Sequence, residues 1–150
     1  MKNFLIPVAV AASLTAAISA GSGAGAAVPA RCAIPATGPL AGRDLSLCPL
    51  VSVNLSGRDL SAANLSGADL SKAILTDCDL SGSDLRNAKL GGASLTRTTL
   101  NGSDLRGADL TGARLTNVDL QASTLETAVL VGVSSKSLLG PADALPAGWV

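Results

Sequence analysis

The sequence contains no histidine and no tyrosine, and it has a single phenylalanine and a single tryptophan. Without histidine, the chain cannot build a Ser-His-Asp triad, a Cys-His pair or a typical zinc site. With so few aromatic side chains, a core filled by large rings is not expected. The sequence therefore predicts a protein that is not an enzyme, with no catalytic, cofactor-binding or metal-binding residues.

The chain also lacks an excess of either charge, because 11 lysines and arginines balance 11 aspartates and glutamates. This balance provides neither the basic surface that nucleic acids attract nor a block of acidic residues. No nucleic-acid partner is expected, and the charge alone identifies no other partner.

Residues 1–26 are predicted to be a secretory signal peptide. Lys2 gives the positive start, an apolar run follows over residues 4–12, and small residues continue from there. Cleavage is expected after Ala26, with Ala20 as the second choice. The mature protein is therefore expected in the cell envelope or outside the cell, without stable membrane insertion.

Two other roles for this N-terminus are disfavoured. An uncleaved membrane anchor would have to span the bilayer with weakly inserting alanine, glycine and serine, and Pro7 interrupts its most apolar part. A lipid anchor on Cys32 would need an apolar recognition sequence before the cysteine, but Arg31 precedes it.

Export makes the three cysteines a question about an oxidising compartment. Cys32 and Cys48 flank a segment with proline and glycine, whereas Cys78 lies within a regular array of small residues. We predict a disulfide between Cys32 and Cys48 and a buried, free thiol at Cys78.

Leucine occupies every fifth position from Leu45 to Leu130. In an α-helix, five residues advance by about 500°, so successive leucines would share no face. In a flat strand, side chains alternate with period two, so successive leucines would point to opposite sides. Both conflicts disappear if the chain turns a corner in every five residues, with each leucine pointing at a common axis. The period therefore predicts a coil.

Two neighbouring positions support the coil. The residue two before each leucine is small through most of the array, as expected for a second inward position in a narrow tube. The residue just before the leucine is often aspartate or asparagine, and Ser-Gly or Thr-Gly often follows it. These types favour exposed corners. For this reason the carboxylates that could be paired for catalysis, Asp79, Asp84 and Asp104, are interpreted as solvated corner residues.

The sequence from Ala63 to Leu70, Ala-Asn-Leu-Ser-Gly-Ala-Asp-Leu, resembles the A-(D/N)-L-x-x signature of the pentapeptide-repeat family, in its secreted bacterial form. The resemblance implies an all-β solenoid, a right-handed quadrilateral β-helix with four pentapeptides per turn. Residues i and i+20 would then stack at a strand spacing of about 4.8 Å. Residues 51–130 are expected to form about four coils.

The pattern weakens at both ends of this array. Residues 27–50 are expected to form an irregular N-terminal segment and cap, because Arg43 takes an inward position, as Arg58 does at the start of the array. Residues 131–150 are expected to form a C-terminal cap over the open end. They also resemble a segment of secreted bacterial members that further repeats follow, so truncation of a longer parent is the alternative.

The resemblance suggests one activity that the charge argues against. Some family members inhibit type II topoisomerases by mimicking the acidic surface of DNA, but residues 51–130 hold seven basic and nine acidic residues. A signal peptide would also separate the protein from that target. We therefore predict a secreted structural or protein-binding module whose partner is an unknown protein or cell-envelope component. An intracellular topoisomerase inhibitor is the alternative.

Overall fold

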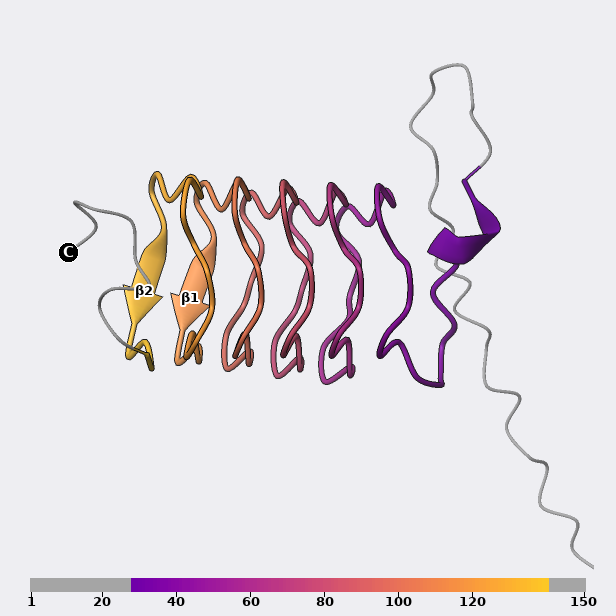
Figure 1. Cartoon of the computed structure of the whole chain (residues 1–150), viewed down its shortest axis with the longest axis horizontal. Coiled ribbons are helices and arrows are strands. Elements are labelled where there is room, and N and C mark those ends of the chain that lie inside the picture. The colour runs from indigo at the N-terminus through magenta and orange to yellow at the C-terminus, as the bar shows by residue number, and fades with distance from the viewer. Residues whose placement is uncertain (1–27, 141–150) are drawn as a thin grey trace, which may run out of the picture.

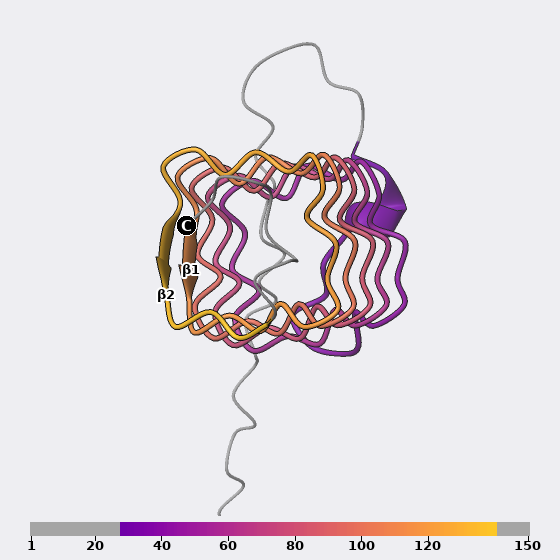
Figure 2. The same cartoon turned by 60° about the vertical axis from the view of Figure 1, so that its left-hand side comes forward.

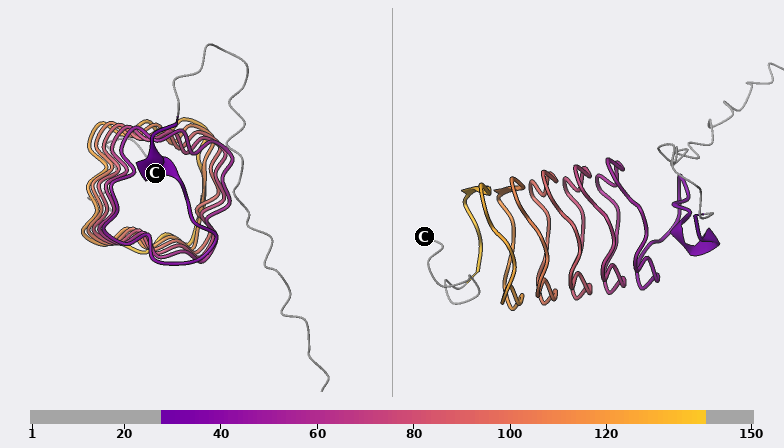
Figure 3. Two further views of the ribbon diagram at one scale, coloured as in Figure 1. Left: turned by 90° about the vertical axis from the view of Figure 1, so that its right-hand side faces the viewer. Right: turned by 90° about the horizontal axis from the view of Figure 1, so that it is seen from above.

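The computed structural model describes residues 28–140, which form a rod of stacked coils (Figure 1). The predicted signal peptide and the last ten residues lie outside the described residues. Seen along the rod, the coils superimpose as a square with flat sides (Figures 2 and 3). A short 3-10 helix, η1 (Ala30–Cys32), lies at the N-terminal end. No helix in this part of the chain has the length and apolar character to cross a bilayer.

Parallel backbone pairing between neighbouring turns holds the rod together. Strand β1 (Arg114–Thr116) pairs with β2 (Ser134–Lys136), and Arg114 lies opposite Ser134. The other turns meet through single parallel bridges with the same offset, from Asp44 with Asn64 to Asp119 with Leu139. The predicted stacking of residue i on residue i+20 is confirmed by these pairs. With five residues to a side, a twenty-residue turn has four sides.

The leucines at every fifth position form the core. Leu80, Leu85, Leu105 and Leu110 are fully buried, which confirms their predicted inward position. The residues two before the leucines are also buried through the middle of the rod. Ser83 and Ser103 are among them, and each hydroxyl donates at 2.7 Å to the carbonyl oxygen of the leucine three residues earlier. Among the described residues, no buried side-chain nitrogen or oxygen lacks a hydrogen-bond partner.

Each corner consists of two residues, and the second adopts a positive φ. Gly67 has φ of 63°, which costs glycine little because it has no Cβ, but Lys72 has φ of 60° at the same position in the next corner. The first corner residue has a different need, since its N–H takes no part in the backbone pairing between turns. At Ser61 this N–H donates to the Asp59 Oδ1 at 2.9 Å, and Ser81 and Asp79 repeat the contact. The aspartate or asparagine before each leucine therefore supplies an acceptor that the ladder does not.

The regular coil is longer than the predicted 51–130. The turn pattern runs from residue 41 to residue 140, so a hundred residues at twenty per turn give five turns where the sequence predicted about four. At the start, Pro49 does not break the coil, because it lies in the first turn, where no earlier turn needs its N–H. At the end, Ser135 replaces an inward leucine, yet the backbone still pairs with the preceding turn.

The two inward arginines hold the N-terminal segment. Arg43 and Arg58 are partly buried, and their guanidinium groups reach toward residues 31–38. Arg43 donates to the carbonyl oxygens of Arg31 and Ala33. Arg58 donates to those of Pro35, at 3.1 Å, and Gly38, at 2.8 Å. These positions accept a long side chain because they lie near the open end of the tube.

Candidate binding faces

The rod presents four outward columns, one on each side, and each is defined by the bridged residues just before the leucines. The arginine face carries Asp44, Asn64, Asp84, Asp104 and Thr124. The lysine face carries Pro49, Asp69, Lys89, Asp109 and Val129. The serine face carries Asn54, Ile74, Ser94, Arg114 and Ser134. The acidic face carries Asp59, Asp79, Thr99, Asp119 and Leu139.

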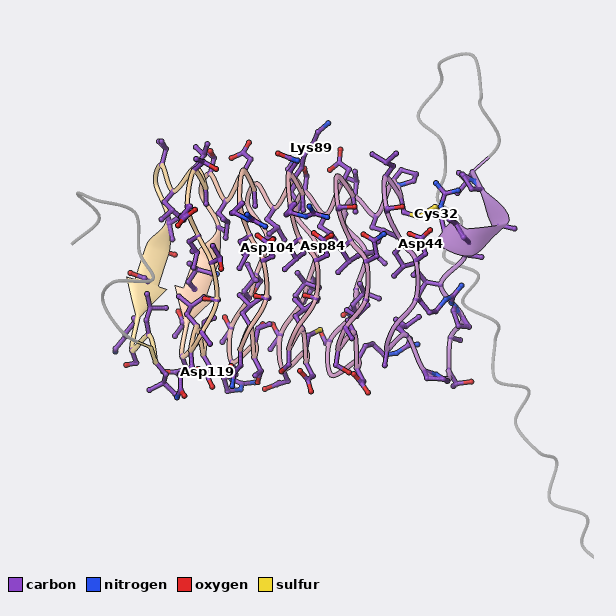
Figure 4. All side chains as sticks on the ribbon, viewed as in Figure 1. Cys32, Asp44, Asp84, Lys89, Asp104 and Asp119 are labelled. Carbon is purple, nitrogen blue, oxygen red and sulfur yellow. A yellow bond between two sulfur atoms is a disulfide. The ribbon has the colours of Figure 1, made fainter. Side chains whose placement is uncertain are left out.

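On the arginine face, corner arginines neutralise the aspartates. The Arg86 guanidinium lies 2.6 Å from the Asp84 carboxylate and 3.8 Å from that of Asp104, and Arg106 lies 2.5 Å from Asp104. Asp44, Asp84 and Asp104 follow one another along the rod (Figure 4). The arginine hydrogen bonds hold the pKa of Asp84 and Asp104 below the ordinary aspartate value. Both carboxylates are therefore already engaged by cations.

On the lysine face, Lys89 lies between Asp69 and Asp109 in the stack, as the twenty-residue register predicts. Its ammonium group lies 3.8 Å from the Asp69 carboxylate. Among the described residues it makes no corresponding ion pair with Asp109, so the expected bridge between two carboxylates is only half formed. Lys89 projects away from the rod (Figure 4), and such an exposed contact contributes little to stability.

A further ion pair crosses two turns at the corner between the serine and acidic faces. The Arg97 guanidinium binds the Asp77 carboxylate through two hydrogen bonds, of 2.6 and 2.7 Å. These hydrogen bonds lower the pKa of Asp77. Both residues take the second corner position, twenty residues apart, so the register could have predicted their contact.

The acidic face differs because its carboxylates have no cationic partner within residues 28–140. Asp59, Asp79 and Asp119 form no salt bridge there, and each accepts a hydrogen bond from the N–H two residues later. The corners that follow these residues carry no charged side chain: they are Ser61-Ala62, Ser81-Gly82, Asn101-Gly102 and Gln121-Ala122. This face therefore offers open carboxylates at fixed spacing along the rod.

The carboxylates considered for catalysis are not brought together. Asp84 and Asp104 stack on the arginine face, whereas Asp79 lies in the column of the acidic face. Within the described part of the chain, no group of three or more histidine, cysteine, aspartate or glutamate residues could hold a metal ion.

The cysteines are all buried. Cys32 and Cys48 are joined by a disulfide, which links η1 to the first turn. Cys78 is free, its thiol donates to the Leu55 carbonyl oxygen at 2.8 Å, and burial raises its pKa to about 11. A thiol with this pKa is protonated at neutral pH and is a poor nucleophile.

The ion pairs of the arginine face predict a dependence of stability on pH. Because the pKa values of Asp84 and Asp104 are lower in the folded state than in the unfolded chain, these groups stabilise the fold above the ordinary aspartate pKa of about 3.9. That contribution is lost as the pH falls through the folded-state values. We expect the thermal midpoint of the double variant Asp84→Asn, Asp104→Asn to fall less on acidification than that of the parent. Equal acid sensitivity of the two proteins would contradict the assignment.

Residues 48–87 and 88–126 match the sequence family described as pentapeptide repeats, in eight copies that together cover more than half of the chain. The chain belongs to the pentapeptide repeat family. Proteins of this family form right-handed quadrilateral β-helices, and they are generally structural or binding modules.

Solved structures of other pentapeptide repeat proteins resemble this one. A protein from the cyanobacterium Cyanothece 51142 is 34% identical, with 59% of this chain and 64% of that chain covered and a TM-score of 0.37. A protein from the thylakoid lumen of Arabidopsis thaliana is 29% identical, with 58% and 64% covered and a TM-score of 0.40. QnrB1, a plasmid-mediated fluoroquinolone resistance protein, is 26% identical, with 63% and 54% covered and a TM-score of 0.41.

This pentapeptide repeat protein spans less than two thirds of the length of each of these three relatives. No curated protein matches its sequence.

Proposed function

We propose that this pentapeptide repeat protein is exported and acts as a non-catalytic module that presents its acidic face to a partner with a basic surface. The partner would be a protein or another component of the cell envelope or the extracellular space. The observation that carries the proposal is that Asp59, Asp79 and Asp119 have no cationic partner within the described residues, whereas Asp77, Asp84 and Asp104 do.

The geometry of the ladder favours recognition of this kind. Hydrogen bonds to the corner N–H groups fix the carboxylate of each aspartate, so little side-chain entropy would be lost on binding. The outer oxygen atoms remain open to a lysine or arginine of the partner. On the arginine face, by contrast, a partner would have to displace Arg86 or Arg106 first.

The alternative function is that of an intracellular protein that inhibits a type II topoisomerase by mimicking DNA. Such a mimic requires negative charge along the rod, and Arg86, Arg97 and Arg106 neutralise much of it here. Cell fractionation with N-terminal sequencing separates the two functions. The proposal expects a mature protein that begins near Ala27 and is found outside the cytoplasm, and an uncleaved cytoplasmic protein would contradict it.

Binding is tested with two variants that change the net charge by the same amount. The acidic-face variant carries Asp59→Asn, Asp79→Asn and Asp119→Asn, which remove three negative charges and keep an oxygen acceptor at each corner. The control variant carries Ile74→Lys, Ser94→Lys and Ser134→Lys, which add three positive charges to the serine face. Both proteins, and the parent, are used to capture partners from envelope and extracellular fractions.

We expect one partner to bind the parent and the control variant, to be lost from the acidic-face variant, and to be released by salt. Equal loss from the two variants would mean that net charge, rather than this face, governs binding. Equal retention by all three proteins would place the binding surface elsewhere.

A further inference from the structure

The last turn of the coil ends in a row of backbone groups that the described residues do not pair. In the preceding turn, the N–H groups of Leu105 and Leu110 each donate at 2.8 Å, to the carbonyl oxygens of Thr124 and Val129. The equivalent N–H groups of Leu125 and Leu130 find no acceptor among residues 28–140. The same register would require acceptors at positions 144 and 149. An edge of this kind accepts one more parallel segment.

Apolar side chains gather at the same end of the rod. Val129 is 43% exposed, Val131 is 68% exposed and Leu139 is 56% exposed. Leu130 and Leu138 are only partly buried, although the leucines of the middle turns are completely covered. The end of the coil therefore presents both an unpaired edge and uncovered apolar surface.

The sequence of residues 141–150 keeps the five-residue register of the coil. Leu145 and Val150 fall on the inward positions, twenty residues after Leu125 and Leu130. Trp149 falls on the outward position, twenty residues after Val129. An apolar side chain thus stands at each of the three positions where the last turn has apolar surface to cover.

The two prolines of this segment fall where a proline costs no ladder hydrogen bond. Pro141 and Pro146 both take the first corner position, whose N–H is unused by the backbone ladder throughout the described turns. That position is also the second residue of a four-residue turn whose third residue has positive φ, and proline is favoured there. Prolines at the other positions of the repeat would each remove a donor.

The chain still lies against the preceding turn where this segment begins. A Cβ placed on Gly140 would lie 3.2 Å from the carbonyl carbon of Leu120 and 3.3 Å from the nitrogen of Gln121. Glycine permits this close approach, so residue 141 starts beside the edge that it would extend.

We propose that residues 141–150 add a further half turn to the coil in the twenty-residue register and cover the edge of residues 121–130. Leu145 packs on Leu125, Val150 packs on Leu130, and Trp149 covers Val129. This inference concerns the end of the rod and does not rest on the proposed function.

Trp149 provides a direct probe, because it is the only tryptophan in a chain without tyrosine. We expect its fluorescence emission in the folded full-length chain to be shifted to shorter wavelength than in denaturant, and to be protected from acrylamide. Val129→Lys should move the emission to longer wavelength. Ile74→Lys is the matched control, because Ile74 is an outward apolar residue with 42% exposure in a middle turn. A tryptophan that is fully exposed in the parent would overturn the proposal.

Amide hydrogen exchange tests the register. In the full-length chain, the N–H groups of Leu125 and Leu130 should exchange slowly, and the double variant Leu145→Asp, Val150→Asp should lose that protection by about tenfold or more. The control variant Ala142→Asp, Ala147→Asp changes the second corner positions, so it should keep the protection. Equal effects of the two double variants would contradict the register. Fluorescence and protection that appear only at high protein concentration, with a doubled mass, would assign the edge to a second copy and overturn the proposal.

Discussion

Replacing Leu105 with alanine is expected to lower the free energy of unfolding by about 2–5 kcal/mol. Leu105 is fully buried, and the twenty-residue register places it between Leu85 and Leu125 in one column of the core. The cavity cannot close easily, because the backbone on both sides is held by the ladder, including the hydrogen bond from the Leu105 N–H to Thr124. The lost transfer energy and the remaining cavity therefore add.

Leu139→Ala is the control, because Leu139 is 56% exposed on the acidic face. Its expected effect lies within about 0.5 kcal/mol. Chemical denaturation followed by circular dichroism measures both variants. Because each turn of a solenoid contacts only its neighbours, hydrogen exchange should locate the loss in the turns next to Leu105. An effect below about 0.5 kcal/mol at Leu105 would exclude it from the core.

The inward leucines and the twenty-residue stacking could be predicted because the period of five has few physical solutions. It fits neither an α-helix nor a flat strand, and a chain that turns every five residues places all the leucines on one axis. The positions of Leu45 and Leu120 in the core follow from that argument alone. The four-sided shape required the resemblance to a family, since the period does not state how many segments complete a turn.

The boundaries of the coil could not be predicted from side-chain pattern. The backbone pairs turn with turn, and this pairing needs neither leucine at positions 135 and 140 nor the usual corner residues around Pro49. The turns at the two ends therefore persist where the sequence signal fades. Arg43 and Arg58 are correctly predicted as departures, but their hydrogen bonds to the N-terminal segment depend on its path, which the repeat does not determine.

The charge pattern of the faces was only partly accessible. The register places Lys89 beside Asp69, and the structure has that contact. The contacts of Arg86 and Arg106 depend on how a corner side chain turns back toward the aspartate two residues earlier, which the period does not give. The acidic face is what remains after these pairs are formed, so sequence reasoning missed it.

Removing the disulfide by Cys32→Ala with Cys48→Ala is expected to cost about 2–4 kcal/mol. The bond closes a loop with a sequence separation of 16 residues, and a loop of about that size corresponds to roughly 3 kcal/mol in the chain-entropy model. Both cysteines are completely buried, so their replacement also removes packed core atoms. Hydrogen exchange and denaturation of the double variant against the parent measure the loss.

The position of the disulfide determines where its loss will be felt. Residues 31–38 are also held by the hydrogen bonds of Arg43 and Arg58, so the segment should loosen while the turns from residue 61 onward keep their protection. Cys78→Ala is the control, because alanine is common at that inward position and the Cys78 thiol takes no part in the bond. Its expected cost is smaller, about 1 kcal/mol.

Mass spectrometry of the non-reduced protein, alkylated after unfolding, identifies the pairing itself. We expect one alkylated residue, Cys78, and one peptide that links Cys32 to Cys48. Burial keeps the Cys78 thiol protonated, with a pKa of about 11, so it should not attack the disulfide during unfolding at neutral pH. A linked peptide that contains Cys78 would show that the bond is not the one that fastens η1 to the first turn. The N-terminal segment would then depend on Arg43 and Arg58 alone.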